Sequence, residues 1–179
     1  IQLTWNAPVL EKIAGWGSQD RYQQFGLGGD PFYFAQKWDT KDLQPVHKKT
    51  IRKVNFYPQE GVTYGVYIKQ GNREYEESFT QLKSGKINSV TLKTPFVIDA
   101  KLDLLVAIHV ISYANNTYPA CSDEGPAVDG KGNLYSLDGK KWETFSDDEL
   151  DANVVLSIVI SAEEGEFPSS SVFSTSTFS

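Results

Sequence analysis

Methionine is absent from this sequence, and cysteine occurs only once, at Cys121. A single cysteine excludes a disulfide bond within the chain. We interpret Cys121 as a structural residue, because neither His47 nor His109 lies in a motif that would supply a base to a nucleophilic thiol. A translated chain begins with methionine, so a sequence that begins at Ile1 is expected to be a processed or trimmed product. Removal of a signal peptide would produce such a start.

Basic residues and long apolar runs are also scarce. The 17 Lys and Arg residues are outnumbered by 23 Asp and Glu residues, which gives a net charge of −6. This balance argues against a nucleic-acid surface, which needs clustered basic residues, and against electrostatic docking on an anionic membrane. The longest apolar run, Leu104–Ile111, is far shorter than the ~20 residues of a membrane-spanning helix. We therefore predict no nucleic-acid partner and no membrane insertion.

The sequence is rich in aromatic residues and contains stretches in which apolar and polar residues alternate. Four Trp, nine Tyr and ten Phe supply material for a core. Apolar and polar residues alternate over Val62–Lys69 and again over Ala152–Ser161, which is typical of half-buried strands. Leu102–Ser112 is apolar on both faces and is predicted to be a central strand. Further strands are expected at Phe32–Trp38, Ile51–Tyr57, Glu74–Leu82, Ile87–Lys93 and, after an interruption at Thr94-Pro95, Phe96–Asp99.

Strands that recur about every ten residues, with turns between them and one helical turn over Asp39–Val46, indicate an all-β protein. We predict a single domain with little helix, folded as a jelly-roll-like antiparallel β-sandwich. Alternating strand–helix units are absent, which excludes a doubly wound α/β fold. The sandwich is expected to span residues 1–162. The Ser/Thr-rich residues 163–179 are interpreted as a tail or linker.

A glycine-rich stretch, Tyr118–Trp142, follows the central strand and has the composition of a long ordered loop and a short hairpin. Four aromatic residues lie within or beside it: Tyr113, Tyr118, Tyr135 and Trp142. Rings with a polar group serve as contact platforms for ligands, so these four are candidate ligand-binding residues. The alternative is that Trp142 and two of the tyrosines seal the end of the sandwich.

The same stretch contains oxygen ligands that could hold calcium. Asp123, Glu124 and Asp129 are the candidate set, because calcium is coordinated by several carboxylate and carbonyl oxygens. Lys131 occupies a ligand position of the Asp129–Asn133 segment, so a β-turn is the preferred interpretation there. We predict no cofactor and retain calcium as the alternative.

Catalytic chemistry has little support. Asp147, Asp148, Glu149 and Asp151 form an acidic cluster, and paired carboxylates can hydrolyse glycosides at suitable separations. No apolar pocket is evident that would raise the pKa of one of them, so we interpret the cluster as a solvated turn before the last strand. We predict no catalytic residue and no enzymatic activity, with glycosidase or protease activity as the least favoured alternative.

Three blocks of sequence resemble a β-sandwich module of secreted and surface proteins of Bacteroidetes-type bacteria, similar to their cleaved-adhesin-like jelly-roll domains. The blocks are Phe34–Trp38 with Asp42-Leu43; Ile51–Pro58 with Tyr64–Ile68; and Tyr118-Pro119 with Asp123–Val128, Gly130–Gly132 and Gly139–Trp142. The resemblance covers about residues 30–160. It implies export, a secreted or cell-surface location and a non-catalytic role in cell adhesion. It supplies no active-site residue.

The expected function is therefore that of a non-catalytic extracellular adhesion or binding module, with a glycan or an extracellular protein as ligand. The alternative is a structural spacer or accessory domain of a larger secreted enzyme, with neighbouring domains as its partners.

Overall fold

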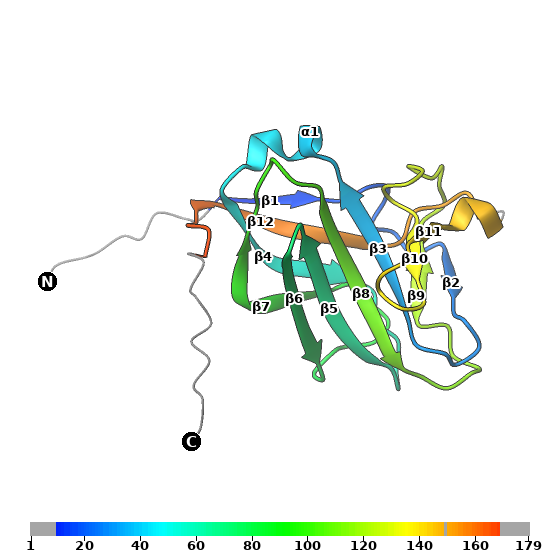
Figure 1. Ribbon diagram of the computed structural model, residues 1–179. Coiled ribbons are helices and arrows are strands. Elements are labelled where there is room, and N and C mark those ends of the chain that lie inside the picture. Colours follow the sequence, from blue (N-terminus) through cyan, green and yellow to red (C-terminus); the bar gives the residue numbers. More distant parts are fainter. Residues whose placement is uncertain (1–9, 149, 169–179) are drawn as a thin grey trace, which may run out of the picture.

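The computed structural model describes residues 10–148 and 150–168 of the chain, and it consists mostly of antiparallel strands. Two sheets pack face to face (Figure 1). The four-stranded sheet has the order β1 (Glu11–Ala14), β12 (Leu156–Glu164), β4 (Lys49–Phe56) and β7 (Asn88–Val97). The six-stranded sheet has the order β11 (Glu143–Thr144), β10 (Leu134–Ser136), β3 (Phe32–Trp38), β8 (Leu104–Ser112), β5 (Thr63–Gln70) and β6 (Arg73–Phe79).

Short elements complete the fold. A two-stranded sheet pairs β2 (Gln23–Phe25) with β9 (Ala120–Ser122). The α-helix α1 (Thr40–Leu43) continues into the 3₁₀ helix η1 (Gln44–Val46), and a second 3₁₀ helix, η2 (Phe145–Asp148), follows β11. None of the helices among the described residues is long and apolar enough to span a membrane.

The strand pairing is that of a jelly roll. Without the short β2, β9, β10 and β11, eight strands remain, and the first pairs with the eighth (β1 with β12), the second with the seventh (β3 with β8), the third with the sixth (β4 with β7) and the fourth with the fifth (β5 with β6). This is one long antiparallel hairpin rolled into two sheets. The predicted all-β jelly-roll-like sandwich is confirmed. Everything between β8 and β12, residues 113–155, is an insertion into this plan.

The core lies between the two sheets. Along β5, the alternate residues Tyr64, Val66 and Ile68 are fully buried, and they meet fully buried side chains such as Phe56 of β4 across the interface. The rings of Phe56 and Tyr64 meet edge to face, with centroids 5.1 Å apart. Each large apolar side chain buried in this way stabilises the fold by about 1.5–3 kcal/mol.

Several predicted elements are confirmed. Phe32–Trp38 forms β3, the helical turn is α1 with η1, and the central apolar strand is β8, which lies between β3 and β5. The predicted interruption at Thr94-Pro95 is wrong, because β7 runs through both residues. The register of β7 against β4 shifts at this point: Ile51 pairs with Phe96, and Lys53 pairs with Thr91. Because β7 is an edge strand, a bulge there can absorb the extra residues between Thr91 and Phe96. Pro95 has no backbone N–H, and an edge strand does not need one there for pairing.

The last strand is also displaced from its prediction. It runs over Leu156–Glu164 instead of Ala152–Ser161, and Val154 makes only an isolated bridge to Ser122. Its expected polar face is buried as well. Residues 15–17 cover part of it: a Cβ on Gly15 would lie 3.0 Å from the Cβ of Ser157. Of the predicted tail, residues 169–179 lie outside the described part.

Candidate functional site: the outer face of the six-stranded sheet

The outer face of the six-stranded sheet carries an ordered array of side chains. The registers of β3, β8 and β5 align three rows across the sheet. They are Tyr33, His109 and Gly65 in the first row; Ala35, Ala107 and Tyr67 in the second; and Lys37, Leu105 and Lys69 in the third. Because successive residues of a strand point to opposite faces, all nine positions lie on the face that points away from the core.

Aromatic rings cluster over the first two rows. The Tyr33 ring stacks on the His109 imidazole, with centroids 4.0 Å apart, and meets the rings of Tyr67 and Trp142 edge-on at 5.8 and 6.2 Å. Ala35 and Ala107 lie beneath and are fully buried. Their small side chains leave room for the larger rings to lie close to the sheet. The result is a second apolar cluster, on the outside of the sandwich.

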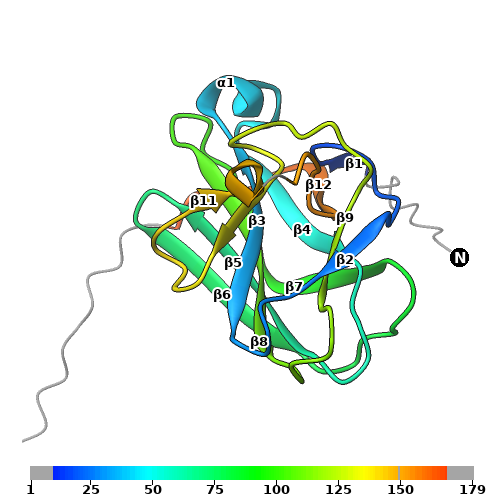
Figure 2. The ribbon, with the colours of Figure 1, turned by 90° about the vertical axis from the view of Figure 1, so that its right-hand side faces the viewer.

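A hairpin from the insertion forms one wall of this face. Strands β10 and β11 extend the sheet beyond β3 (Figure 2), and the connection between them lies close to Tyr33. Gly139 makes the close approach: its φ is +71°, and a Cβ there would lie 3.2 Å from the Tyr33 ring. The Asp138 carboxylate accepts hydrogen bonds from the backbone N–H groups of Lys140 and Lys141, both at 2.8 Å. These contacts fix the hairpin that ends at Trp142.

A hollow of about 500 Å³ opens between this hairpin and the sheet. Its apolar wall is formed mainly by Trp142, Leu105 and Leu134. Its volume falls within the range of ~300–1,000 Å³ that is usual for small-molecule sites.

Two ion pairs border the hollow. The Lys37 ammonium lies 3.0 Å from the Asp103 carboxylate, and the Lys69 ammonium lies 2.9 Å from that of Glu74. Hydrogen bonds from Lys69 and from the Tyr67 hydroxyl hold the pKa of Glu74 below its usual value. Burial, and then the hydrogen bond to Glu74, raises the pKa of Tyr67 to about 12. Tyr67 is therefore a neutral phenol at physiological pH, and its hydroxyl donates to a carboxylate.

His109 lies at the other end of the array. Its Nδ1 is 3.0 Å from Glu76 Oε1, and its ring is covered by Tyr33. Burial, followed by the nearby carboxylates of Glu76 and Asp138, raises the pKa of Tyr33. Aromatic, cationic and anionic groups are thus combined on one face, which can offer stacking, hydrogen-bond donation and hydrogen-bond acceptance to a ligand.

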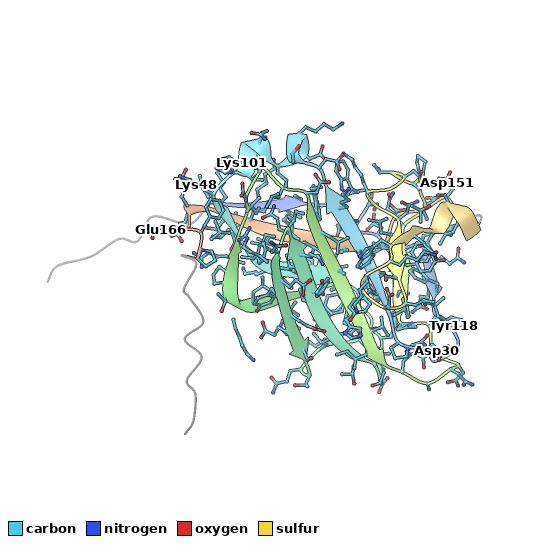
Figure 3. The ribbon with its side chains drawn as sticks, viewed as in Figure 1. Asp30, Lys48, Lys101, Tyr118, Asp151 and Glu166 are labelled. Atoms are coloured by element: carbon cyan, nitrogen blue, oxygen red, sulfur yellow. The ribbon has the colours of Figure 1, made fainter. Side chains whose placement is uncertain are left out.

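The structure does not bring the four predicted platform residues together. Trp142 borders the hollow. Tyr118 is 58% exposed, in the loop after β8, and Figure 3 shows it at the end of the sandwich where Asp30 is also labelled. Tyr113 accepts a hydrogen bond from the Leu27 N–H at 2.7 Å and packs edge-on against Phe32.

The fourth predicted residue, Tyr135, stacks on Phe145, with centroids 4.7 Å apart, and packs against the core. Sequence reasoning missed Tyr33 and Tyr67 as site residues. A signal was available for Tyr67, because the alternation of Val62–Lys69 places it on the side opposite to Val66 and Ile68.

The calcium candidates also fail to converge. Residues 10–148 and 150–168 contain no group of three or more His, Cys, Asp or Glu residues placed to hold a metal ion. Glu124 is exposed, and Asp129 accepts hydrogen bonds from Asn133 and Ser146. Of the acidic cluster, Glu149 lies outside the described residues, and Asp151 accepts a hydrogen bond from the Ala127 N–H.

Asp123 lies at the centre of a buried hydrogen-bond network. Its carboxylate is buried, and each oxygen accepts two hydrogen bonds. Oδ1 accepts from the N–H groups of Gly125 and Asn153, at 2.9 and 2.8 Å, and Oδ2 accepts from the Ser18 N–H at 2.8 Å and the Asn153 side chain at 3.1 Å. The Asn153 side chain continues the network to the Pro126 carbonyl and the Val128 N–H. This network ties the N-terminal segment, the insertion and the approach to β12 together.

Comparison of the chain with protein-family models, with curated proteins and with solved structures finds no match. The family resemblance therefore stays a prediction.

Proposed function

We propose that this chain is a non-catalytic extracellular binding module for adhesion, and that it holds a glycan on the outer face of its six-stranded sheet. The observation that carries the proposal is the position of Trp142, which borders the hollow beside the Lys37–Asp103 and Lys69–Glu74 pairs. A saccharide presents apolar C–H faces that pack on aromatic rings. Its hydroxyl groups need donors and acceptors at the same place, and each ion pair supplies both.

The form of the site supports a saccharide over a large partner. The hollow has the volume of a small-molecule site, and a fixed hairpin, which needs little ordering on binding, closes one side of it. The resemblance to secreted adhesin modules agrees with an extracellular location. A protein ligand is the competing outcome.

The test compares two aromatic variants. Purified protein is screened on a glycan array, and the affinity for each bound glycan is measured by calorimetry for wild type, Trp142→Ala and Tyr118→Ala. We expect Trp142→Ala to weaken binding by roughly tenfold or more, since stacking on an aromatic ring contributes on the order of 1–2 kcal/mol. Tyr118→Ala removes a more exposed ring elsewhere and should bind as wild type does.

Two results would contradict the proposal. If Tyr118→Ala loses binding and Trp142→Ala keeps it, the site is the loop after β8. If the array stays blank while a screen of extracellular proteins finds a ligand, the glycan assignment is wrong. Thermal unfolding of both variants checks that each has kept its fold.

A further inference from the structure

The hollow beside Trp142 is positively charged on an acidic protein. Three lysines line it, Lys37, Lys69 and Lys140, against one carboxylate, Asp103. The whole chain carries a net charge of −6. The other main hollows of the described chain are lined by residues with no net charge or with an excess of carboxylates. The excess of lysines is therefore a property of the lining of this hollow, and Glu74, which pairs with Lys69, lies beside it.

The lysines are not equally neutralised. Lys37 contacts two carboxylates, those of Asp103 at 3.0 Å and Asp39 at 3.7 Å. Among the described residues, Lys69 pairs with Glu74 alone and Lys140 makes no ion pair. The charge of Lys140 contributes to the lowered pKa of Glu74, after the hydrogen bonds from Lys69 and Tyr67. Lys140 is therefore the least neutralised of the three lysines.

The shape of the hairpin keeps Lys140 in this position. Its backbone N–H is held by the Asp138 carboxylate, and Gly139 before it presses on Tyr33. The stem of Lys140 therefore starts from a held backbone position, and Lys140 and Lys69 both line the hollow. An anion between the two lysines would receive charge-assisted hydrogen bonds from both, which are the strong kind.

We infer that the hollow takes an acidic saccharide, whose carboxylate or sulfate group lies between Lys69 and Lys140 while a sugar ring packs on Trp142. This inference depends on the proposed glycan-binding function and specifies its ligand class. The shared chemistry is an anionic group on a sugar, and uronic acids and sulfate esters are its two sources.

Calorimetry with matched ligands tests the inference. Galacturonate oligomers are compared with the same oligomers after methyl esterification, which removes the charge and keeps the sugar backbone. Sulfated dextran oligomers are compared with unmodified dextran oligomers in the same way. In at least one pair we expect the charged member to bind roughly tenfold or more tightly than the neutral member, and added salt to reduce the difference.

The double variant Lys69→Gln with Lys140→Gln should abolish that preference. The double variant Lys83→Gln with Lys86→Gln, which removes the same two charges from the exposed turn between β6 and β7, is the control and should keep it. Trp142→Ala should weaken binding of the charged ligand as well. Preference for the galacturonate pair identifies a carboxylate, and preference for the dextran pair identifies a sulfate ester.

The remaining outcomes separate the two proposals. If neutral glycans bind, depend on Trp142 and are indifferent to the lysine variants, the acidic ligand is ruled out and the glycan site stands. If charged ligands bind but Trp142→Ala has no effect, the interaction is charge attraction without a sugar subsite, and the inference is overturned. If no glycan of either kind binds, the proposed function itself fails.

Discussion

Replacing Asp123 with asparagine tests whether a buried carboxylate, and not a calcium ion, organises the glycine-rich insertion. The substitution keeps the shape of the side chain and exchanges one acceptor oxygen for an amide that donates. In the wild type, each carboxylate oxygen accepts two N–H groups. In the variant, two of these four donors face another donor.

The expected loss follows from the number of hydrogen bonds. A hydrogen bond to a charged group contributes about 1.5–3 kcal/mol, so the loss of two corresponds to ~3–6 kcal/mol. Asp123 is only 2% exposed, so water cannot easily replace the missing acceptor. A domain of ordinary stability has ~5–15 kcal/mol in total. The variant should therefore be marginally folded.

Urea unfolding followed by tryptophan fluorescence measures the effect. Glu124→Gln is the matched control, since Glu124 is the exposed neighbour from the same predicted calcium set, and it should unfold as wild type does. Calcium at millimolar concentration should leave the wild-type melting temperature unchanged. The reasoning is refuted if Asp123→Asn loses less than about 1 kcal/mol, or if calcium raises the melting temperature and both variants abolish that rise.

Three further changes probe other parts of the insertion. Gly139→Ala should destabilise the protein by about 1–2 kcal/mol, because a side chain is strained at a φ of +71° and would press on the Tyr33 ring; urea unfolding measures this, and an unchanged midpoint would contradict it. For Asp42, burial acts to raise the pKa, but the hydrogen bonds from Lys131 and from the backbone lower it below its usual value. The stability that the Asp42–Lys131 ion pair contributes should be present above about pH 4 and decline as the pH falls through the lowered pKa of Asp42. Lys131→Met should remove that part of the acid sensitivity in pH-dependent melting curves. Burial raises the pKa of Cys121 to about 11, so a thiol reagent at pH 8 should label the protein in urea and leave the native protein unlabelled; fast native labelling would show the thiol to be accessible.

The sandwich could be predicted because its signals are local. Alternation along Val62–Lys69 and the doubly apolar run at Leu102–Ser112 each identify a strand from fewer than a dozen neighbouring residues. Pro95 misled the prediction for a non-local reason. Whether a strand tolerates proline depends on its being at the edge of a sheet, and strand order is set by pairing partners far away in the sequence.

The candidate site needed the same distant information. Tyr33, Tyr67 and His109 are 34 and 42 residues apart along the chain, and only the registers of β3, β8 and β5 place them on one face. Only the side of Tyr67 could be read from the sequence, because Val62–Lys69 is the one of the three strands that alternates. What could not be read is that small residues, Ala35 and Ala107, would lie next to each other beneath the rings.

Asp123 illustrates a different limit. In the sequence, an acidic residue in a glycine-rich loop looks like a calcium ligand. The hydrogen-bond partners of Asp123 are instead mostly backbone N–H groups, which every residue except proline carries. The glycines have a complementary explanation. A Cβ on Gly17 would lie 2.1 Å from Asp123 Oδ2, and one on Gly132 would lie 2.1 Å from Asn153 Oδ1. They are there because the buried polar side chains approach the backbone closely.

The buried network and the hollow belong to one insertion, and the contacts between them predict that they are coupled. Gly132 accepts a hydrogen bond from the Val154 N–H, next to Asn153, and Lys131 accepts one from the Lys37 N–H of β3, just before β10 begins. The hairpin that carries Trp142 therefore starts from a segment that the Asp123 network holds. Asp123→Asn, assayed at a temperature where it remains folded, should bind the glycan several-fold more weakly, although Asp123 is not among the residues that line the hollow. Wild-type affinity in that variant, together with weakened binding in Gly139→Ala, would show instead that the contact with Tyr33 alone positions the hairpin.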